Sequence, residues 1–334
     1  MNHPCYICGL GSCIPPRVMT NHDLEKLVET SDEWITTRTG IKERHVLEDG
    51  VNASDCGAEA ARAALEEAGV LPEEVTHVFV ATCTPDYLCP STACVIASKL
   101  GISAADGRMG NVMCLDFNAA CTGFVYGLEL ARNTVQSHPD AVVLLVATEA
   151  LSRRTNFTDR TTCVLFGDAA GAVVIRSEEK GALWQLRDVV CSSDGSLHDL
   201  IKIGGGSACH IKEGDAVGAD WFISMQGMAV FKHAVRSMTE ESQTILARNG
   251  ISLDELDLFI PHQANLRIIK AVGERLGIDE SKVFANVQHY GNTSAATLPV
   301  AMEDARRSGA LKPGMKVLLT SFGGGMTWGS ALLA

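Results

Sequence analysis

The stretch that decides the fold is Val112–Val135, which reads VMCLDFNAACTGFVYGLELARNTV. It opens with an apolar run, Val112 to Leu115, typical of a buried strand. From Phe124 onward, apolar residues recur every three or four positions, which indicates the buried face of a helix. Cys121 therefore lies between the end of a predicted strand and the start of a predicted helix. A thiol there faces unpaired backbone N–H groups and the positive end of the helix dipole, and both favour the thiolate.

This stretch alone leaves two interpretations of Cys121 open. Small neighbours on each side leave room for a substrate, which suits a nucleophile. The other interpretation is one more buried small side chain, as most cysteines are. The rest of the chain has to decide between them.

The composition is that of a globular α/β protein. Of the 334 residues, 46% are hydrophobic, 20% are charged and only 5% are aromatic, which suits closely packed α/β layers. The formal net charge of −12 argues against a general nucleic-acid binder, which needs a basic face. No apolar run approaches the roughly 18 residues that a membrane span requires. The start of the sequence does not resemble a signal peptide.

The cysteines predict a reduced, cytoplasmic protein. The 12 cysteines are scattered through apolar segments, without the density of a disulfide scaffold. Cys5 and Cys8 have the C-x-x-C spacing of some zinc sites, but no further ligand pair at comparable spacing is evident. If their segment is a strand, alternation puts the two side chains on opposite faces. We therefore expect no metal site there.

Caps and apolar runs outline alternating strands and helices. A first strand is predicted to end at Gly9–Ser12, where prolines rather than a helix follow, so this Gly-x-Gly fails as a dinucleotide fingerprint. Thr20 and Ser31 are predicted to cap two helices, and the polar segment Thr37–Ile41 is predicted to be a loop. Ala141–Ala147 is a continuous apolar run, which predicts a central strand covered on both faces.

A repeat indicates that the chain is internally duplicated. Leu65–Val80 (LEEAGVLPEEVTHVFV) and Leu246–Pro261 (LARNGISLDELDLFIP) share a helix end, a glycine, an acidic linker and a buried strand. Gly69 aligns with Gly250, an offset of 250 − 69 = 181. Chance similarity between αβ units is the alternative. Because the period is too long for a solenoid, we predict two similar halves, residues 1–180 and 181–334, packed together.

Four features lie at predicted strand ends, where open α/β sheets bind their ligands. They are Cys121, His262 in PHQAN, Asn292 in YGNTS, and the glycine triplet Gly323–Gly325. A histidine can act as a base, a hydrogen-bond donor or a metal ligand, and asparagine offers an amide donor. Bare glycine N–H groups can form an oxyanion hole. Each feature alone is ordinary loop chemistry. Together they predict an active site shared by the two halves.

Six segments resemble one known family. They are SDEWITTRTGIKERH, FNAACTGFVYGLE, FGDAAGAVV, PHQANLRII, YGNTSAAT and SFGGGMTWGSALL. In order and over essentially the whole chain, they are similar to β-ketoacyl-acyl carrier protein synthase III, the initiating condensing enzyme of fatty acid synthesis. The resemblance implies a thiolase-like five-layered α/β/α/β/α sandwich of two duplicated halves, usually as a homodimer. The N-terminal half would carry the nucleophilic cysteine, and the C-terminal half the catalytic histidine and asparagine.

The resemblance also implies roles residue by residue. Cys121 matches the nucleophile, His262 the catalytic histidine and Asn292 the catalytic asparagine, and the backbone amides of Cys121 and Gly324 match the oxyanion hole. The coenzyme A positions are matched by Trp34, Arg38, Arg160 and Asn265. Lys232 and Arg267 match positions implicated in docking the acyl carrier protein, and Arg236 and Lys270 lie one helical turn from them. Such a basic patch suits an acidic carrier protein.

The implied reaction is a decarboxylative Claisen condensation. Cys121 takes the acyl group of acetyl-CoA or a related short acyl-CoA, and coenzyme A leaves. Malonyl-acyl carrier protein then loses carbon dioxide, while His262 and Asn292 donate hydrogen bonds to the thioester oxygen of the resulting enolate. The enolate attacks the acyl-enzyme and gives 3-oxoacyl-acyl carrier protein, which initiates type II fatty acid synthesis. The reaction requires no metal or redox cofactor.

Related functions differ at single positions. Elongating condensing enzymes carry a second histidine in place of Asn292, and thiolases carry a second cysteine in the terminal glycine loop, where this chain has none. Plant-type polyketide synthases run longer. Acyl-CoA-primed homologues that make a secondary metabolite or signal molecule share the same triad and stay open as an alternative. A non-catalytic carrier-binding scaffold would have lost one of the three catalytic side chains, and all three are present.

Cys89 marks a departure from the family pattern. It lies where well-known members place a phenylalanine that closes the primer pocket from across the dimer. A smaller side chain there predicts a pocket that admits branched or longer primers, unless bulk elsewhere fills the space. The acyl group that Cys121 carries is therefore left open.

Overall fold

The computed structural model describes residues 3–102, 112–207, 209 and 217–334. The strands are β1 (Tyr6–Cys13), β2 (Arg17–Thr20), β3 (Glu43–Val46), β4 (His77–Ala81), β5 (Met113–Phe117), β6 (Val143–Glu149), β7 (Ala169–Arg176), β8 (Trp184–Ser193), β9 (Ile201–Ile203), β10 (Ile223–Met225), β11 (Leu258–Pro261), β12 (Val317–Gly323) and β13 (Thr327–Leu333). The α-helices are α1 (Asn21–Leu24), α2 (Asp32–Thr39), α3 (Ala53–Ala68), α4 (Thr92–Lys99), α5 (Gly123–Ser137), α6 (Gly227–Asn249), α7 (Leu266–Leu276), α8 (Val287–Tyr290) and α9 (Thr297–Arg307). Two short 3-10 helices carry site residues, η3 (Ala120–Thr122) and η8 (Ser294–Ala296).

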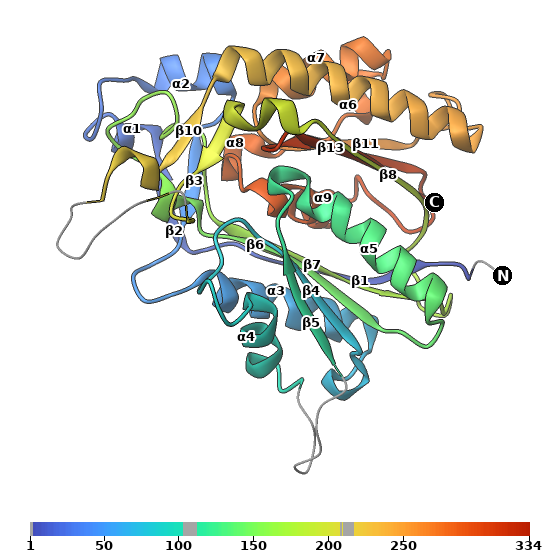
Figure 1. Cartoon of the computed structure of the whole chain (residues 1–334). Coiled ribbons are helices and arrows are strands. Elements are labelled where there is room, and N and C mark those ends of the chain that lie inside the picture. Colours follow the sequence, from blue (N-terminus) through green and yellow to red (C-terminus); the bar gives the residue numbers. More distant parts are fainter. Residues whose placement is uncertain (1–2, 103–111, 208, 210–216) are drawn as a thin grey trace.

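These elements form five stacked layers, the α/β/α/β/α sandwich expected from the sequence. Figure 1 shows α3 and α4 over one outer face, α6 and α7 over the other, and α5 and α9 between the two sets of strands. α5 contacts β6 on one side and β8 and β13 on the other, so it belongs to the central layer. Three large apolar clusters fill the spaces between the layers. One surrounds α5 and α9, one lies under α3 and α4, and one lies under α6 and α7. Burial of these faces is the main favourable contribution to folding.

The strands run in the order β11-β12-β13-β8-β1-β7-β6-β4-β5. β8 and β1 are joined by only two residue pairs, Tyr6 with Gln185 and Ile7 with Trp184. Every strand on the β1 side of this join precedes residue 181, and every strand on the β8 side follows it. β4 pairs in parallel with β6, as β11 does with β12, so the two sides repeat one arrangement.

The sequence repeat is also a repeat of local geometry. Gly69 ends α3 with a φ of 61°, and Gly250 ends α6 with a φ of 63°. The next amide donates back into the helix in both places, from Val70 to the carbonyl of Leu65 and from Ile251 to that of Leu246, each at 3.0 Å. Glycine is favoured at such a left-handed helix end because it has no Cβ.

The first strand does not end where the sequence predicted. β1 continues through Gly9 and Gly11, which lie under α3. A Cβ on Gly9 would lie 2.0 Å from the carbonyl oxygen of Ala64, and a Cβ on Gly11 would lie 2.4 Å from that of Ala60. These glycines therefore mark the close approach of a helix to a strand rather than a turn.

The predicted loop Thr37–Ile41 is wrong in its first half. α2 runs to Thr39, so Arg38 lies in the last helical turn. Ser31 caps the start of this helix, as predicted, by accepting a hydrogen bond from the amide of Trp34 at 3.1 Å. Gly40 ends it with a φ of 79° and approaches α7, since a Cβ there would lie 2.5 Å from the Cβ of Leu266.

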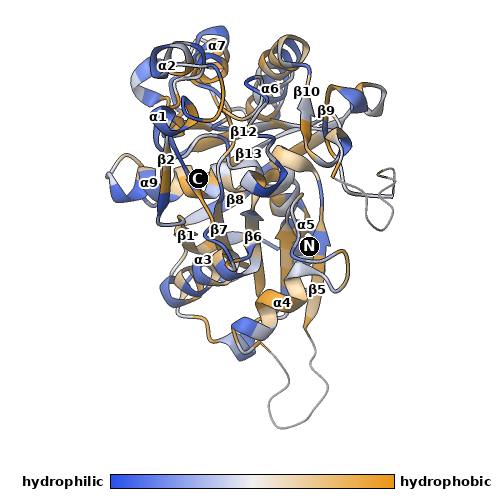
Figure 2. Cartoon of the chain, turned by 90° about the vertical axis from the view of Figure 1, so that its left-hand side faces the viewer, coloured by the Kyte–Doolittle hydropathy of each residue, from blue (hydrophilic) through white to orange (hydrophobic). Residues whose placement is uncertain are grey.

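The predictions for the two long apolar runs have different outcomes. β6 is buried along its whole length, as Ala141–Ala147 predicted. β5, predicted to be buried, is the edge strand of the sheet, and Met113 and Leu115 are 52% and 37% exposed. Figure 2 shows this edge and the neighbouring strands as largely hydrophobic. Hydropathy alone does not distinguish a covered strand from an apolar edge. Within the described ranges, no helix is long and apolar enough to cross a membrane.

Candidate active site

Cys121 lies in η3, between the end of β5 and the first turn of α5. The preceding residue, Ala120, has a φ of 46°, an unusual backbone conformation for a side chain other than glycine. The side chain of Asn118 accepts a hydrogen bond from the Ala120 amide at 2.9 Å and supports this turn. Ser321, on β12, donates a hydrogen bond to the carbonyl of Cys121 at 2.7 Å. The strand-to-helix position predicted from the sequence is confirmed.

The terminal glycine loop packs directly against the backbone of Cys121. A Cβ on Gly323 would lie 2.6 Å from the amide nitrogen of Cys121 and 3.0 Å from that of Thr122. Only glycine allows this approach. Gly324 follows it and lines a cavity together with Cys121. The loop therefore brings backbone amides close to the thiol.

His262 follows β11 and is buried. Its Nδ1 lies 2.6 Å from the hydroxyl of Thr297, and that hydroxyl lies 3.0 Å from the carbonyl of Ser294. Burial lowers the pKa of His262 to about 3. The imidazole is therefore neutral at neutral pH, with one ring nitrogen as donor and the other as acceptor.

Asn292 is buried and held from both sides. Its amide donates to the carbonyl of Leu165 at 2.8 Å, and its carbonyl accepts from the amide of Gly167 at 3.1 Å. Its side-chain oxygen accepts from the amide of Ser294 at 2.8 Å. Because the oxygen is engaged, the NH₂ group is left as the donor for a ligand.

Cys121, His262 and Asn292 line one cavity of about 470 Å³. Its other walls are largely apolar, and its polar lining residues include Trp34, Arg38, Lys232, Asn265 and Arg267. A second cavity of about 210 Å³ also reaches Cys121. Its apolar walls are formed by Leu151, Phe166, Ile201, Ile203 and Ile223. The thiol thus lies between a longer channel and a smaller apolar pocket.

An aromatic and cationic cluster lies at the longer channel. The guanidinium carbons of Arg38 and Arg160 lie 5.1 Å and 4.9 Å from the centre of the Trp34 ring. Asn265 caps α7 by accepting from the amide of Arg267 at 2.8 Å, and its NH₂ group donates to the carbonyl of Arg38 at 3.2 Å. A flat ring beside two guanidinium groups suits a nucleotide with phosphates. Arg160 belongs to this cluster but does not line the channel itself.

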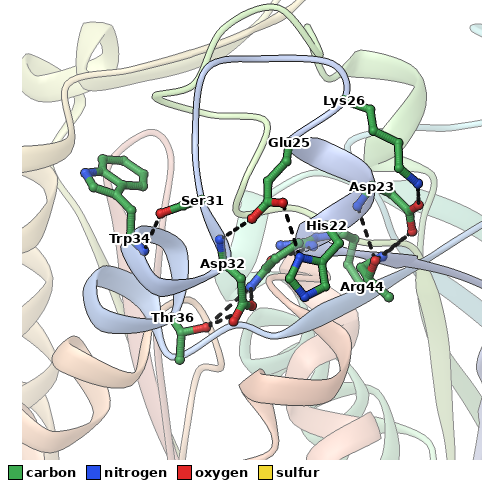
Figure 3. A network of polar contacts seen from close by, with 11 residues as sticks. His22, Asp23, Glu25, Lys26, Ser31, Asp32, Trp34, Thr36 and Arg44 are labelled. Atoms are coloured by element: carbon green, nitrogen blue, oxygen red, sulfur yellow. Dashed lines mark hydrogen bonds and ion pairs between the residues drawn. The ribbon is translucent and has the colours of Figure 1, made fainter.

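A network of polar contacts holds α2, and with it Trp34, in place (Figure 3). Asn21 is its centre. The NH₂ group of Asn21 donates to Asp32 at 2.8 Å, and its oxygen accepts from Arg44 at 2.9 Å. Arg44 is fully buried and also donates to the carbonyl of Val164 at 2.8 Å, one residue before the segment that holds Asn292. The network therefore links the aromatic cluster to the loop of the buried asparagine.

The four basic residues predicted for docking fall into two pairs. Lys232 on α6 and Arg267 on α7 line the channel. Arg236 forms an ion pair with Glu240 at 2.9 Å, and Lys270 forms one with Glu280 at 3.5 Å. The first pair is thus placed at the channel, whereas the second pair lies farther out with acidic neighbours.

The pKa of Cys121 differs from the sequence expectation. Burial raises it to about 12, and the nearby carboxylate of Glu149 adds to the rise. Hydrogen bonds from Ser294 and Asn292 lower it, but not enough to offset burial. A helix N-terminus was expected to favour the thiolate, yet desolvation of a buried anion outweighs that effect here. The resting side chain of Cys121 is a thiol.

Sequence reasoning missed several polar residues around the triad. Ser294 and Thr297 belong to the quoted YGNTSAAT segment, in which only Asn292 was singled out. Glu149 and Cys83, at the ends of β6 and β4, lie at the strand ends where ligands were expected. Cys89 is exposed and lines neither cavity.

Comparisons with known proteins agree on one family. The 3-oxoacyl-[acyl-carrier-protein (ACP)] synthase III family matches residues 115–195, and its C-terminal region matches residues 246–334. The β-ketoacyl-[acyl-carrier-protein] synthase III of Nitratidesulfovibrio vulgaris (strain Miyazaki F) is 60% identical over 98% of this chain and 97% of the relative. The crystal structure of 3-oxoacyl-[acyl-carrier-protein] synthase III from Aquifex aeolicus matches with a TM-score of 0.88 at 42% identity, over 98% and 99% of the two chains. The priming β-ketosynthase of the R1128 polyketide pathway matches with a TM-score of 0.90 at 34% identity, over 99% and 96%.

The raised pKa of Cys121 predicts slow alkylation of the free protein. Only a thiolate reacts with iodoacetamide, and burial delays thiolate formation to higher pH. We expect alkylation of Cys121 to keep rising above about pH 9, beyond the ordinary thiol range near 8.5. Peptide mass spectrometry resolves each site, and the exposed Cys89 and Cys94 serve as internal references. Full alkylation of Cys121 at pH 7, at the rate of the two references, would contradict the buried thiol.

Proposed function

This chain belongs to the 3-oxoacyl-[acyl-carrier-protein] synthase III family, and we propose that Cys121, His262 and Asn292 carry out its reaction. The protein is an acyltransferase that catalyses the condensation initiating fatty acid synthesis. Its substrates are an acyl-CoA and malonyl-acyl carrier protein. The observation that supports the residue assignment is the single channel on which all three side chains meet.

The first half-reaction transfers the acyl group to Cys121. Its sulfur attacks the thioester carbon, and the carbonyl oxygen becomes an oxyanion. The backbone amides of Cys121 and Gly324 receive that oxyanion. This assignment is supported by the glycine loop, which packs within van der Waals contact of the Cys121 backbone. Coenzyme A then leaves as a thiolate.

The second half-reaction forms the carbon–carbon bond. Malonyl-acyl carrier protein loses carbon dioxide, and its thioester oxygen gains negative charge. Asn292 donates from its NH₂ group, because its oxygen is already held by Ser294. His262 donates from Nε2 in the tautomer in which the single proton of the Thr297 hydroxyl turns from the carbonyl of Ser294 to Nδ1. Two donors in a dry site stabilise the enolate more than they would in water.

Coenzyme A and the carrier protein share the longer channel. Trp34, Arg38 and Arg160 offer a ring and two cations to the nucleotide end, and Asn265 lines the path of the pantetheine arm. Lys232 and Arg267 face an acidic carrier protein at the channel. Arg236 and Lys270 extend this basic surface, and their acidic partners weaken their contribution.

The chain acts as a homodimer joined through β5. An apolar edge strand exposes unpaired backbone groups and needs a cover. Met113 and Leu115 are exposed on this edge, and Leu88, beside Cys89, is 90% exposed. A partner on this edge covers these side chains and brings Cys89 toward the primer pocket of the other copy.

We place the boundary between the two halves at residues 180/181. The helix–glycine–strand repeat and the short pairing of β8 with β1 support this division. The N-terminal half then supplies the nucleophile, and the C-terminal half supplies His262 and Asn292. The cytoplasmic location inferred from the cysteines stays a prediction.

An acyl-CoA-primed homologue of specialised metabolism is the second candidate. The observation that favours it is the apolar pocket of about 210 Å³ beside Cys121. That volume is about seven times the roughly 30 Å³ share of a water molecule, more than an acetyl group requires. The small side chain of Cys89 also favours a primer larger than acetyl.

Asn292→Ala separates the two half-reactions. We expect it to keep acylation of Cys121 by acyl-CoA and to lower condensation roughly 100-fold, because one enolate donor is lost. Intact-protein mass spectrometry measures acylation, and 3-oxoacyl-acyl carrier protein formation measures condensation. Cys121→Ser is the matched control and should lose the acyl-enzyme altogether. Normal condensation by Asn292→Ala would sink the assignment.

Leu115→Lys tests the dimer. A lysine on the apolar edge should disfavour strand pairing, so we expect the chain to shift from dimer to monomer in size-exclusion chromatography with light scattering. Leu71→Lys adds the same charge at an exposed leucine outside β5 and should leave the dimer intact. A monomeric parent protein, or a Leu115→Lys variant that stays fully dimeric, would rule out pairing through β5.

Primer competition tests the smaller pocket. We offer acetyl-, isobutyryl- and octanoyl-CoA together and read the acyl mass on Cys121. Because the pocket exceeds the needs of acetyl, we expect isobutyryl to be loaded at a rate comparable to acetyl. Loading of acetyl alone would show that other side chains fill the space left by Cys89 and would weigh against specialised primers.

A further inference from the structure

A second ionisable group lies buried behind the nucleophile. Glu149 ends β6 and has no exposed surface. Its carboxylate accepts from the hydroxyl of Thr84 at 2.6 Å and from the amide and thiol of Cys83, each at 3.2 Å. Within the described residues, no lysine, arginine or histidine pairs with it. Burying a carboxylate without a cationic partner destabilises the fold, so a functional role would explain why Glu149 lies here.

Ser294 connects this carboxylate to Cys121. Its hydroxyl lowers the pKa of both Cys121 and Glu149, which places it beside each of them. It also lies 3.8 Å from the thiol of Cys83. Cys83, Cys121 and Ser294 line the same small cavity. The titratable groups that face Glu149 are therefore the two thiols, on the loop after β4 and on η3.

The acylation step needs an acceptor for the proton of Cys121. His262 is poorly suited, because burial keeps its imidazole neutral and lowers its pKa to about 3. Burial acts in the opposite direction on a carboxyl group and raises the pKa of Glu149 above its ordinary value. A carboxylate of raised basicity, one hydroxyl away from the thiol, is the better acceptor.

We propose that Glu149 takes the proton of Cys121 through the hydroxyl of Ser294 during acylation and returns it after condensation. This inference rests on the proposed role of Cys121. The Cys121 proton moves to Ser294 Oγ as the Ser294 proton moves to Glu149. The sulfur bonds to the acyl carbon, and the bond from that carbon to the sulfur of coenzyme A breaks. After condensation Cys121 leaves as a thiolate, and Glu149 returns the proton along the same path.

This cycle also keeps like charges apart. The acyl-enzyme then holds a neutral, protonated Glu149 when the anionic malonyl group enters the site. The enolate that follows also carries negative charge, and a buried carboxylate nearby would raise its energy. One negative charge enters on the malonyl group and one leaves on coenzyme A, so the buried site never holds two.

The test is acylation of Cys121 as a function of pH in three variants. Glu149→Gln keeps the shape of the side chain without an acceptor charge, and Ser294→Ala removes the relay hydroxyl. Glu241→Gln is the matched control, because Glu241 is also buried and accepts a hydrogen bond from the hydroxyl of Ser192 at 3.0 Å. Glu241 lines neither of the two cavities that reach Cys121. Mass spectrometry of quenched single turnovers with acetyl-CoA gives the rate between about pH 6 and pH 10.

We expect the parent rate to fall as the pH drops through the pKa of Glu149. Glu149→Gln and Ser294→Ala should acylate roughly 100-fold more slowly at neutral pH and recover as hydroxide replaces the lost acceptor. Acyl-enzyme prepared at high pH from either variant should still condense with malonyl-acyl carrier protein. This result would separate the proton acceptor from the proposed enolate donors, whose loss affects condensation.

Alkylation of Cys121 provides a readout that a purely structural role would not move. Glu149→Gln removes a negative charge that raises the pKa of the thiol, so alkylation should begin at lower pH than in the parent protein. The proposal is overturned if Glu149→Gln acylates at the parent rate with the parent pH profile. It is also overturned if the alkylation profile does not shift, or if Glu241→Gln slows acylation equally.

Discussion

The site depends on one close contact between the two halves of the chain. β12 brings Gly323 against the amide of Cys121, at a distance that no Cβ would allow, and Ser321 holds the carbonyl of the same residue. The proposed nucleophile comes from the proposed N-terminal half, whereas the glycine loop, His262 and Asn292 come from the proposed C-terminal half. Packing of β12 on η3 therefore fixes the reacting thiol relative to its partners. The central layer of α5 and α9 makes this possible, because it holds both sets of strands at a common face.

A second constraint lies in the turn after Asn292. Ser294, with a φ of 50°, donates its amide to the side chain of Asn292 and offers its carbonyl to Thr297, the partner of His262. One residue thus orients both proposed enolate donors through its backbone, while its hydroxyl faces Cys121. Strain of this kind persists only where surrounding contacts over-determine it. Here those contacts come from the segment around Gly167, which holds Asn292 on the other side.

Sequence reasoning predicted what depends on local pattern. The strand-to-helix position of Cys121, the buried strand β6 and the matching helix ends at Gly69 and Gly250 follow from periodicity and glycine chemistry. It failed where tertiary packing decides. β1 continues past Gly9 because α3 lies on it, and β5 is an edge because no strand among the described residues pairs with its outer side. The roles around the triad were also underestimated. Ser294 and Thr297 contact Cys121 and His262, from which they are distant in sequence, so local pattern could not reveal these contacts.

The pKa of Cys121 shows how burial serves opposing demands. A dry cavity strengthens every hydrogen bond to the enolate, because no water competes for the thioester oxygen. The same dryness destabilises a resting thiolate and a protonated imidazole, so Cys121 and His262 are both neutral before substrate arrives. The charge needed for attack must then appear only as the thioester reacts. In the proposed relay, the buried carboxylate of Glu149, beyond Ser294, accepts the proton of Cys121 at that moment. It suits this role because burial makes a carboxylate more basic, whereas burial makes an imidazole less basic.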